Sequence, residues 1–437
     1  MNAIVDNLPG GWMNWKKFRI TFDNVIEIFL CTLIICLPFS KSMVEICFGG
    51  VFILWVIKRF LTCRDKSVIE IIKSFKPAAA RLNVPILAFV LVNLVSTLTS
   101  LSVFLSLEGF FFKLFEGVAI YFVIVDFYDN SEKINRFLTA LFFSIILISA
   151  NGLYQYIFGT DFIRGYSFNG HGGIQSSFGN PNDFAAWLVM IIPFVIALAF
   201  FWKSEWVACF SKHIKPIMKN ARFLFLPVGF VLLVCLVLVG SRGAWLASLL
   251  SLFFLGFILK SRKLIVVLLL VIFVIPFIIP DRVKERAVSI LNSNEIGGSI
   301  NIRLKLWREA MEIIEDFPLL GTGPNTYSIV APEYKNESKT GFYPHNSYLH
   351  MAAETGLLGI GAFLWIVLAL FKTTFHKIKK IGNDFERTLL AGFLAGMAGF
   401  LAHSIVDTNL YALQLNMLMW MVMGLIISVQ NQTSVTD

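Results

Sequence analysis

Residues 343–371 read YPHNSYLHMAAETGLLGIGAFLWIVLALF, and this stretch decides the fold because it joins a polar boundary to a membrane-length run. The run from Met351 to Phe371 is predominantly apolar, and roughly 20 such residues in a helix span the hydrocarbon core of a bilayer. A polar segment, 281–345, precedes it. The titratable His345 therefore stands where the predicted helix meets water, at the level of a lipid head group.

The composition of the whole chain is that of an integral membrane protein. Hydrophobic residues make up 57% of 437 and charged residues 15%, and the mean hydropathy is +0.74. A water-soluble protein of this length needs more polar surface. We predict a single all-α membrane domain, 1–437, with twelve transmembrane helices at approximately 25–40, 43–60, 84–106, 109–127, 135–158, 183–202, 223–239, 243–259, 264–280, 346–371, 388–404 and 411–429.

The basic residues predict the orientation of these spans. With the N-terminus inside, most of the 37 Lys and Arg residues fall in loops assigned to the cytoplasm, as the positive-inside rule requires. An even number of spans then places both termini in the cytoplasm. The net charge of +9 reflects this sidedness and implies contact with anionic membrane lipids. The charge pattern gives no support for nucleic-acid binding.

Two predicted outer loops stand out by length, 159–182 and 281–345. The shorter loop is rich in glycine and ends in Asn and Asp residues, which are typical of a helix N-cap. We therefore expect Asn182 or Asp183 to start the sixth span.

The larger outer loop, which lies between the ninth and tenth spans, contains a helical pattern of its own. Leu304, Trp307, Met311 and Ile314 recur at helical spacing, with charged residues between them. This spacing predicts an amphipathic helix on the membrane face, ending before Pro318. The loop is thereby organised as a lid over the membrane surface rather than as a linker.

Three arginines in the predicted outer segments are candidates for binding an anion. Arg242 lies in a tight turn between two apolar spans, Arg303 begins the amphipathic helix, and Arg164 lies in the shorter loop. A guanidinium group binds phosphate in bidentate fashion, so a lipid pyrophosphate is a suitable partner. The alternatives are a snorkelling arginine at 242, a surface charge at 303 and an ordinary loop arginine at 164.

His345 is the candidate general base, because a free imidazole is partly neutral at neutral pH and can accept a hydroxyl proton. The alternative is an interfacial histidine at the start of the tenth span, with Asn346 as the N-cap. His350 lies five residues further along the same helix, so it points elsewhere and is expected to be a packing residue. His171 and His403 are weaker candidates.

Lys113 and Glu116 lie one helical turn apart in an apolar span, where they can pair, or where Lys113 can steer an anion. The sequence contains no H-E-x-x-H, C-x-x-C or D-x-D motif, and no nucleotide-binding loop. We therefore expect neither a metal nor a cofactor. The remaining candidate is an active site on the predicted outer side of the membrane, built from arginine and histidine.

The outer segments contain a series of short motifs in a fixed order. They are Gly179–Asn182, Gly240–Gly243, Arg303, Leu304, Trp307, Ala310, Pro318–Gly321, Gly323, Tyr327, His345–Leu349, Glu354 and Gly356–Gly359. Each motif is short, but their order and their predicted sidedness make the combination specific. Together they resemble the motifs of the O-antigen ligase and polymerase superfamily, bacterial membrane glycosyltransferases that use glycans linked to undecaprenyl pyrophosphate.

The resemblance implies an O-antigen ligase that transfers a glycan from undecaprenyl pyrophosphate to a sugar hydroxyl of lipid A-core. The reaction is metal-independent and inverting, on the periplasmic face of the bacterial inner membrane. It implies His345 as general base, with Arg242 and Arg303 on the pyrophosphate. Further substrate-binding candidates are Arg164, Asn180, Asn182, Lys113, Tyr327, Asn346 and Tyr348.

Two other functions are compatible with the sequence. A polymerase of the same superfamily uses the same donor but elongates another lipid-linked glycan. A transporter of the lipid-linked glycan performs no chemistry, but many transporters have duplicated halves and charges inside several spans. This chain shows little of either feature.

Overall fold

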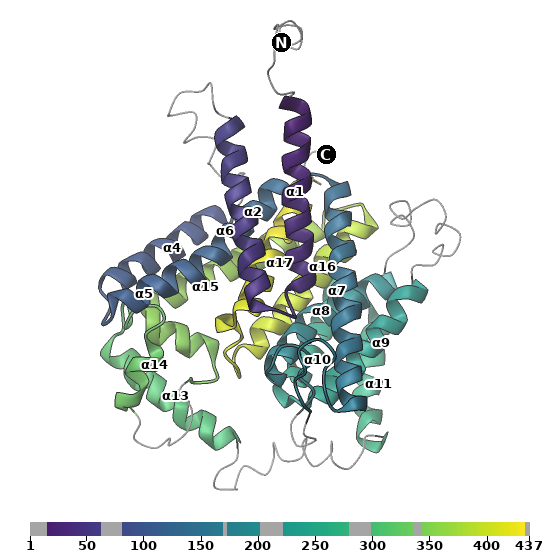
Figure 1. Cartoon of the computed structure of the whole chain (residues 1–437). Helices are drawn as coiled ribbons and strands as arrows, with labels where there is room; N and C mark the ends of the chain where they lie inside the picture. Colours follow the sequence, from purple (N-terminus) through teal and green to yellow (C-terminus); the bar gives the residue numbers. More distant parts are fainter. Residues whose placement is uncertain are drawn as a thin grey trace, which may run out of the picture.

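The structure is a computed structural model that describes residues 15–62, 81–168, 173–201, 222–278, 299–334 and 343–432. Within these ranges the regular structure is helical, with one isolated β-bridge between Thr160 and Ser167. The elements, drawn in Figure 1, are α1 (Trp15–Cys36), α2 (Lys41–Thr62), α4 (Asn83–Leu98), α5 (Val103–Gly109), η2 (Phe110–Phe115), α6 (Glu116–Phe127), α7 (Ser131–Phe158), α8 (Pro181–Phe201), α9 (Arg222–Val239), α10 (Arg242–Ile258), α11 (Arg262–Ile278), α13 (Ser299–Asp316), α14 (Tyr327–Val330), η4 (Ala331–Tyr334), α15 (Ser347–Ile378), α16 (Asp384–His403), η5 (Asn409–Tyr411) and α17 (Leu413–Gln432).

Each of the twelve predicted spans overlaps at least one helix, and the third is interrupted between Leu98 and Val103. Within the described ranges, five helices are long and apolar enough to cross a membrane, namely α7, α8, α15, α16 and α17. The all-helical membrane fold is thus confirmed. The total of twelve spans and the side that each end faces stay predictions.

Two predicted boundaries are wrong. The third span was expected over 84–106, but α4 ends at Leu98 because the serine-rich stretch that follows forms side-chain bonds to the backbone, among them Ser100 Oγ to the Thr322 carbonyl at 3.1 Å. The sixth span begins at Pro181 rather than at residue 182 or 183. The Asn180 side chain caps it by accepting from the Asn182 amide at 2.9 Å.

The core is formed by helices that are distant in sequence. α8 packs against α16 and α9, α10 packs against α16, and α17 packs against α6. The Phe194 and Phe393 rings stack across the contact of α8 and α16, with centroids 4.4 Å apart. α8 and α16 are thereby fixed side by side, and their outer ends form the floor of the site described below.

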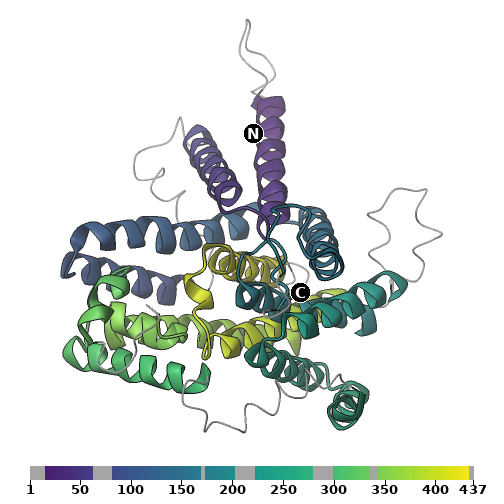
Figure 2. The same ribbon diagram turned by 60° about the horizontal axis from the view of Figure 1, so that its bottom comes forward.

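The predicted amphipathic helix is present as α13, and it ends at Asp316, before Pro318, as expected. It lies along α15 (Figure 2). Its buried face consists of Leu306, Ala310 and Ile313, while Leu304 and Met311 are about half exposed. One side of α13 therefore packs on the protein and an adjacent apolar side is left at the surface, which suits a helix at a membrane interface.

The tenth predicted span is not a continuous helix. α15 is broken at Gly356, whose φ of +67° is a conformation that favours glycine. The turn that follows α13 enters this break. Leu357 donates its amide to the Pro318 carbonyl at 2.8 Å, and Gly323 donates to the Glu354 carbonyl at 2.8 Å. Backbone groups freed by the break are thus satisfied, and the end of the large outer loop is tied to the membrane helices.

Candidate active site

The ends of four helices, on the side predicted to face outward, surround one polar pocket of about 160 Å³. Its lining comes from the start of α8, the start of α10, the first turns of α13 and the end of α16. None of the described residues that line it is acidic. The lining residues are Asn182, Gly240, Ser241, Arg242, Gly243, Arg303, His403 and Val406.

The start of α10 forms one wall of this pocket. Gly240 reverses the chain with a φ of +68°, and Arg242 is the first residue of the helix. Gly243 allows a close approach, because a Cβ at this position would lie 2.6 Å from Val406 Cγ2. Ser241 forms no side-chain cap, so the first-turn amides at the positive end of α10 are available to an anion.

Arg303 reaches the same pocket from α13 and is partly buried. Burial lowers the pKa of its guanidinium, the charge of Asp407 raises that pKa, and the charge of Arg242 lowers it. A guanidinium keeps its proton at neutral pH. The pocket therefore holds two like charges in proximity, and a multivalent anion would relieve their repulsion.

His345 is not among the lining residues, and its side chain is 42% exposed. Its backbone has a φ of +46°, an uncommon conformation for a residue with a side chain. His345 Nδ1 lies 3.4 Å from Asp407 Oδ1. This arrangement places the second ring nitrogen, Nε2, away from the carboxylate, where it can accept a proton.

Asp407 is the carboxylate that orients His345, and its residue is 6% exposed. Burial by itself raises the pKa of Asp407, but the hydrogen bond from His345, the nearby His403 and the bond from the Thr408 amide bring the pKa below its ordinary value. Asp407 is therefore ionised at neutral pH. A buried ionised carboxylate at Nδ1 favours the tautomer with a free Nε2.

The turn after α16 connects the His345–Asp407 pair to the arginine pocket. The Ser347 amide donates to the carbonyls of Ser404 and Asp407, at 2.9 and 3.1 Å. Val406, which precedes Asp407, lines the pocket. The structure thus brings Arg242, Arg303 and Asn182 into one pocket and places His345 at its border.

Other predicted residues have structural partners. Arg164 is exposed, donates to the Phe39 carbonyl at 2.8 Å and lies over the Tyr166 ring. It is not among the residues that line the arginine pocket. The expected clamp of three arginines is therefore a pair in the described structure.

The residues around the start of α15 mainly hold the helix. Asn346 caps it by accepting from the amides of Tyr348 and Leu349. The Tyr348 hydroxyl donates to the Leu401 carbonyl at 2.7 Å. His350 is a packing residue, as expected, with its ring stacked on Tyr411 at 3.6 Å.

A second pocket, of about 80 Å³, is lined by Lys113, Asn325 and Tyr411 among others. Lys113 Nζ donates to Asn325 Oδ1 at 2.6 Å, so the expected pairing with Glu116 is not found. Tyr327 is buried near this cluster and donates its amide to Glu354 Oε1 at 3.1 Å.

The sequence analysis did not identify Asp407, and it gave His403 only as a weaker candidate for the site. Both belong to a short polar connection, 403–409, between two apolar helices. Polar side chains at such a boundary are a signal that could have been used. His171 lies outside the described residues.

The chain was compared with known proteins and protein families. Comparison with curated proteins finds none that matches. Residues 227–364 match the family model described as O-Antigen ligase, and the matched segment includes Arg242, Arg303 and His345. Asp407 and His403 lie beyond it. This match over the central segment, together with the apolar helices, supports the superfamily of O-antigen ligases and polymerases.

Proposed function

We propose that this protein is an O-antigen ligase that transfers a glycan from undecaprenyl pyrophosphate to a sugar hydroxyl of lipid A-core, on the periplasmic face of the inner membrane. The observation that carries the proposal is the location of Arg242 and Arg303 in one pocket whose border holds the His345–Asp407 pair. Two guanidinium groups and the positive end of α10 suit a pyrophosphate.

In the proposed reaction, the acceptor hydroxyl oxygen attacks the anomeric carbon of the donor glycan. His345 Nε2 takes the hydroxyl proton as the new bond forms. The bond between the anomeric carbon and the phosphate oxygen breaks, and both of its electrons leave with the pyrophosphate. Arg242 and Arg303 stabilise the negative charge that develops there. A single displacement of this kind inverts the anomeric configuration.

Hydrogen bonds made by the loop between α11 and α15 support the proposed roles of Arg303 and His345. α13 carries Arg303, and the turn after α13 is bonded into the break of α15 at Gly356. α15 in turn begins at Ser347, two residues after His345. The arginine and the base are therefore connected through one set of backbone hydrogen bonds, which holds reacting groups in a fixed geometry.

The test is reconstitution of the purified protein with a defined donor and acceptor, in the presence of a metal chelator. We expect conjugate with an inverted linkage from the wild type and almost none from His345→Ala. Full turnover by His345→Ala would remove the general-base assignment. Labelled donor that reaches the opposite leaflet with its glycan still attached would favour a transporter instead.

The second candidate is a polymerase, because the superfamily that the sequence motifs resemble includes polymerases that use the same donor. A deletion strain separates the two. Loss of a polymerase leaves core with one repeat unit attached, whereas loss of a ligase leaves core without glycan.

A further inference from the structure

His403 lines the arginine pocket and has no role in the reaction described above. It is the last residue of α16 and is 1% exposed. Arg242 and Arg303 line the same pocket. A buried polar ring at such a position needs partners for both of its nitrogens, so the question is which of them carries the proton.

The contact with Asn409 determines whether Nδ1 of His403 donates or accepts. The Asn409 Nδ2 atom lies 3.0 Å from His403 Nδ1 and 3.3 Å from Ser404 Oγ. Ser404 Oγ donates its own proton to the Phe400 carbonyl at 2.9 Å, so it can only accept from Asn409. The amide nitrogen of Asn409 therefore faces both atoms, and Nδ1 is an acceptor. An imidazole that accepts at Nδ1 carries its proton on Nε2.

The Nε2 edge of the ring faces the start of α10. A Cβ built on Gly243 would lie 3.4 Å from His403 Cδ2 and 3.6 Å from Nε2. The N–H of His403 is thus on the side of the ring that borders the pocket, whereas the Asn409 contact is on the other side.

We infer that His403 is a third ligand of the pyrophosphate, a neutral imidazole that donates its Nε2 hydrogen to a phosphate oxygen, and that Asn409 is the positioning residue that fixes this tautomer. This inference rests on the proposed function and adds a contact to its donor site. A neutral donor adds a directional hydrogen bond without a third positive charge beside two guanidinium groups. A lysine at this position would increase their repulsion.

The experiment uses a matched pair of variants of the full-length protein in lipid nanodiscs. In His403→Gln the side-chain amide can occupy the place of Nε2, whereas in His403→Asn it can occupy the place of Nδ1. The probe is unglycosylated undecaprenyl pyrophosphate, and its Kd is measured for each protein. Thermal unfolding is recorded alongside. Arg242→Ala serves as the control for the pyrophosphate site itself.

We expect His403→Gln to bind within about threefold of the wild type and His403→Asn to bind about 10- to 100-fold more weakly, as loss of a hydrogen bond to a charged group predicts. Equal Kd values for wild type and His403→Asn would overturn the inference. Equal weakening in both variants would also overturn it, because the role would then be packing. If Arg242→Ala binds like the wild type, the proposed pyrophosphate site itself fails.

Discussion

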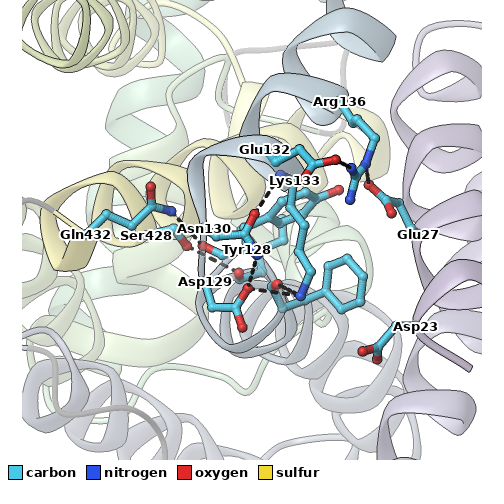
Figure 3. A network of polar contacts seen from close by, with 12 residues as sticks. Asp23, Glu27, Tyr128, Asp129, Asn130, Glu132, Lys133, Arg136, Ser428 and Gln432 are labelled. Carbon is cyan, nitrogen blue, oxygen red and sulfur yellow. Dashed lines mark hydrogen bonds and ion pairs between the residues drawn. The ribbon is translucent and has the colours of Figure 1, made fainter. Parts of the chain in front are cut away.

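Basic residues occur at both ends of the helical bundle, but their surroundings differ. At the predicted cytoplasmic end, Lys133 Nζ lies 2.9 Å from Asp129 Oδ1, and Arg136 pairs with both Glu27 and Glu132 (Figure 3). We call these five residues the inner network. Each of its cations has a carboxylate partner, on the same helix, on a neighbouring helix or in the connection before α7.

At the outer end, two arginines from different elements line one pocket, and none of its described lining residues is acidic. Charges that are neutralised within a protein hold elements together, whereas like charges gathered at a cavity are suited to a ligand of opposite sign. The comparison therefore predicts that substitutions at the outer end change catalysis, and that substitutions in the inner network change stability.

The largest effect is expected for His345→Gln. The glutamine amide keeps hydrogen-bonding ability but cannot take up the acceptor proton, and general bases contribute about 100- to 10,000-fold to rate. We expect kcat to fall by about that factor with little change in the KM for donor. Single-turnover assays with defined lipids measure the rate of transfer. An unchanged rate would contradict the assignment of catalysis to the outer end of the bundle.

Arg242→Ala and Arg303→Ala come next. Each removes a group that stabilises the leaving pyrophosphate, and loss of one such donor typically costs ~2.7–4 kcal/mol of transition-state stabilisation. Lysine at either position keeps the charge but loses the bidentate geometry, so it should restore activity only in part. Donor dependence of kcat/KM measures both effects. Full activity in either alanine variant would contradict the shared anion site.

Asp407→Asn is expected to have a smaller effect, about 10- to 100-fold on kcat, because Asp407 acts through His345. The ionised form of Asp407 also stabilises the fold, since its pKa is lowered. That contribution is present above the ordinary value of about 3.9 and is lost as the pH falls through the lower folded value.

Unfolding measurements at several pH values test this second point. Wild type and Asp407→Asn should show parallel stability curves between pH 5 and 8. The advantage of the wild type should shrink only below about pH 3.9. An advantage of the wild type that does not shrink as the pH falls below this value would contradict the ionised carboxylate at Asp407.

Gly243→Ala tests how closely α10 must approach the turn after α16. The added methyl group would lie 2.6 Å from Val406 Cγ2, and overpacking of this kind costs about 1–3 kcal/mol. We expect a loss of transfer of roughly fivefold, smaller than for the arginines. The double variant Gly243→Ala/Val406→Ala should recover most of the activity. Failure of this rescue would show that the loss of transfer does not come from the steric contact between residue 243 and Val406.

The sequence was sufficient for features that depend on local pattern. Apolar runs predicted the helices, and the spacing of Trp307 and its neighbours predicted α13 and its end. Arg242, Arg303 and His345 could be chosen because each is a polar residue at the predicted edge of an apolar run.

Features that depend on remote partners were not predicted. A glycine inside an apolar run has a modest cost in a helix, so Gly356 gave no sign that a turn near Pro318 would enter the break. Asp407 is 62 residues from His345 in the chain. Their contact follows from the packing of α15 beside α16, which one sequence does not specify.

The smallest effect on catalysis is expected for Arg136→Ala, the inner counterpart of Arg242→Ala. The Arg136 side chain is 45% exposed, and exposed ion pairs contribute about 0–1 kcal/mol. We expect unfolding to shift by no more than that amount and transfer to stay within about twofold of the wild type. Both variants remove one guanidinium group, Arg136 from the inner network and Arg242 from the arginine pocket. A loss of transfer in Arg136→Ala as large as that in Arg242→Ala would mean that position in the arginine pocket does not separate functional from structural arginines in this fold.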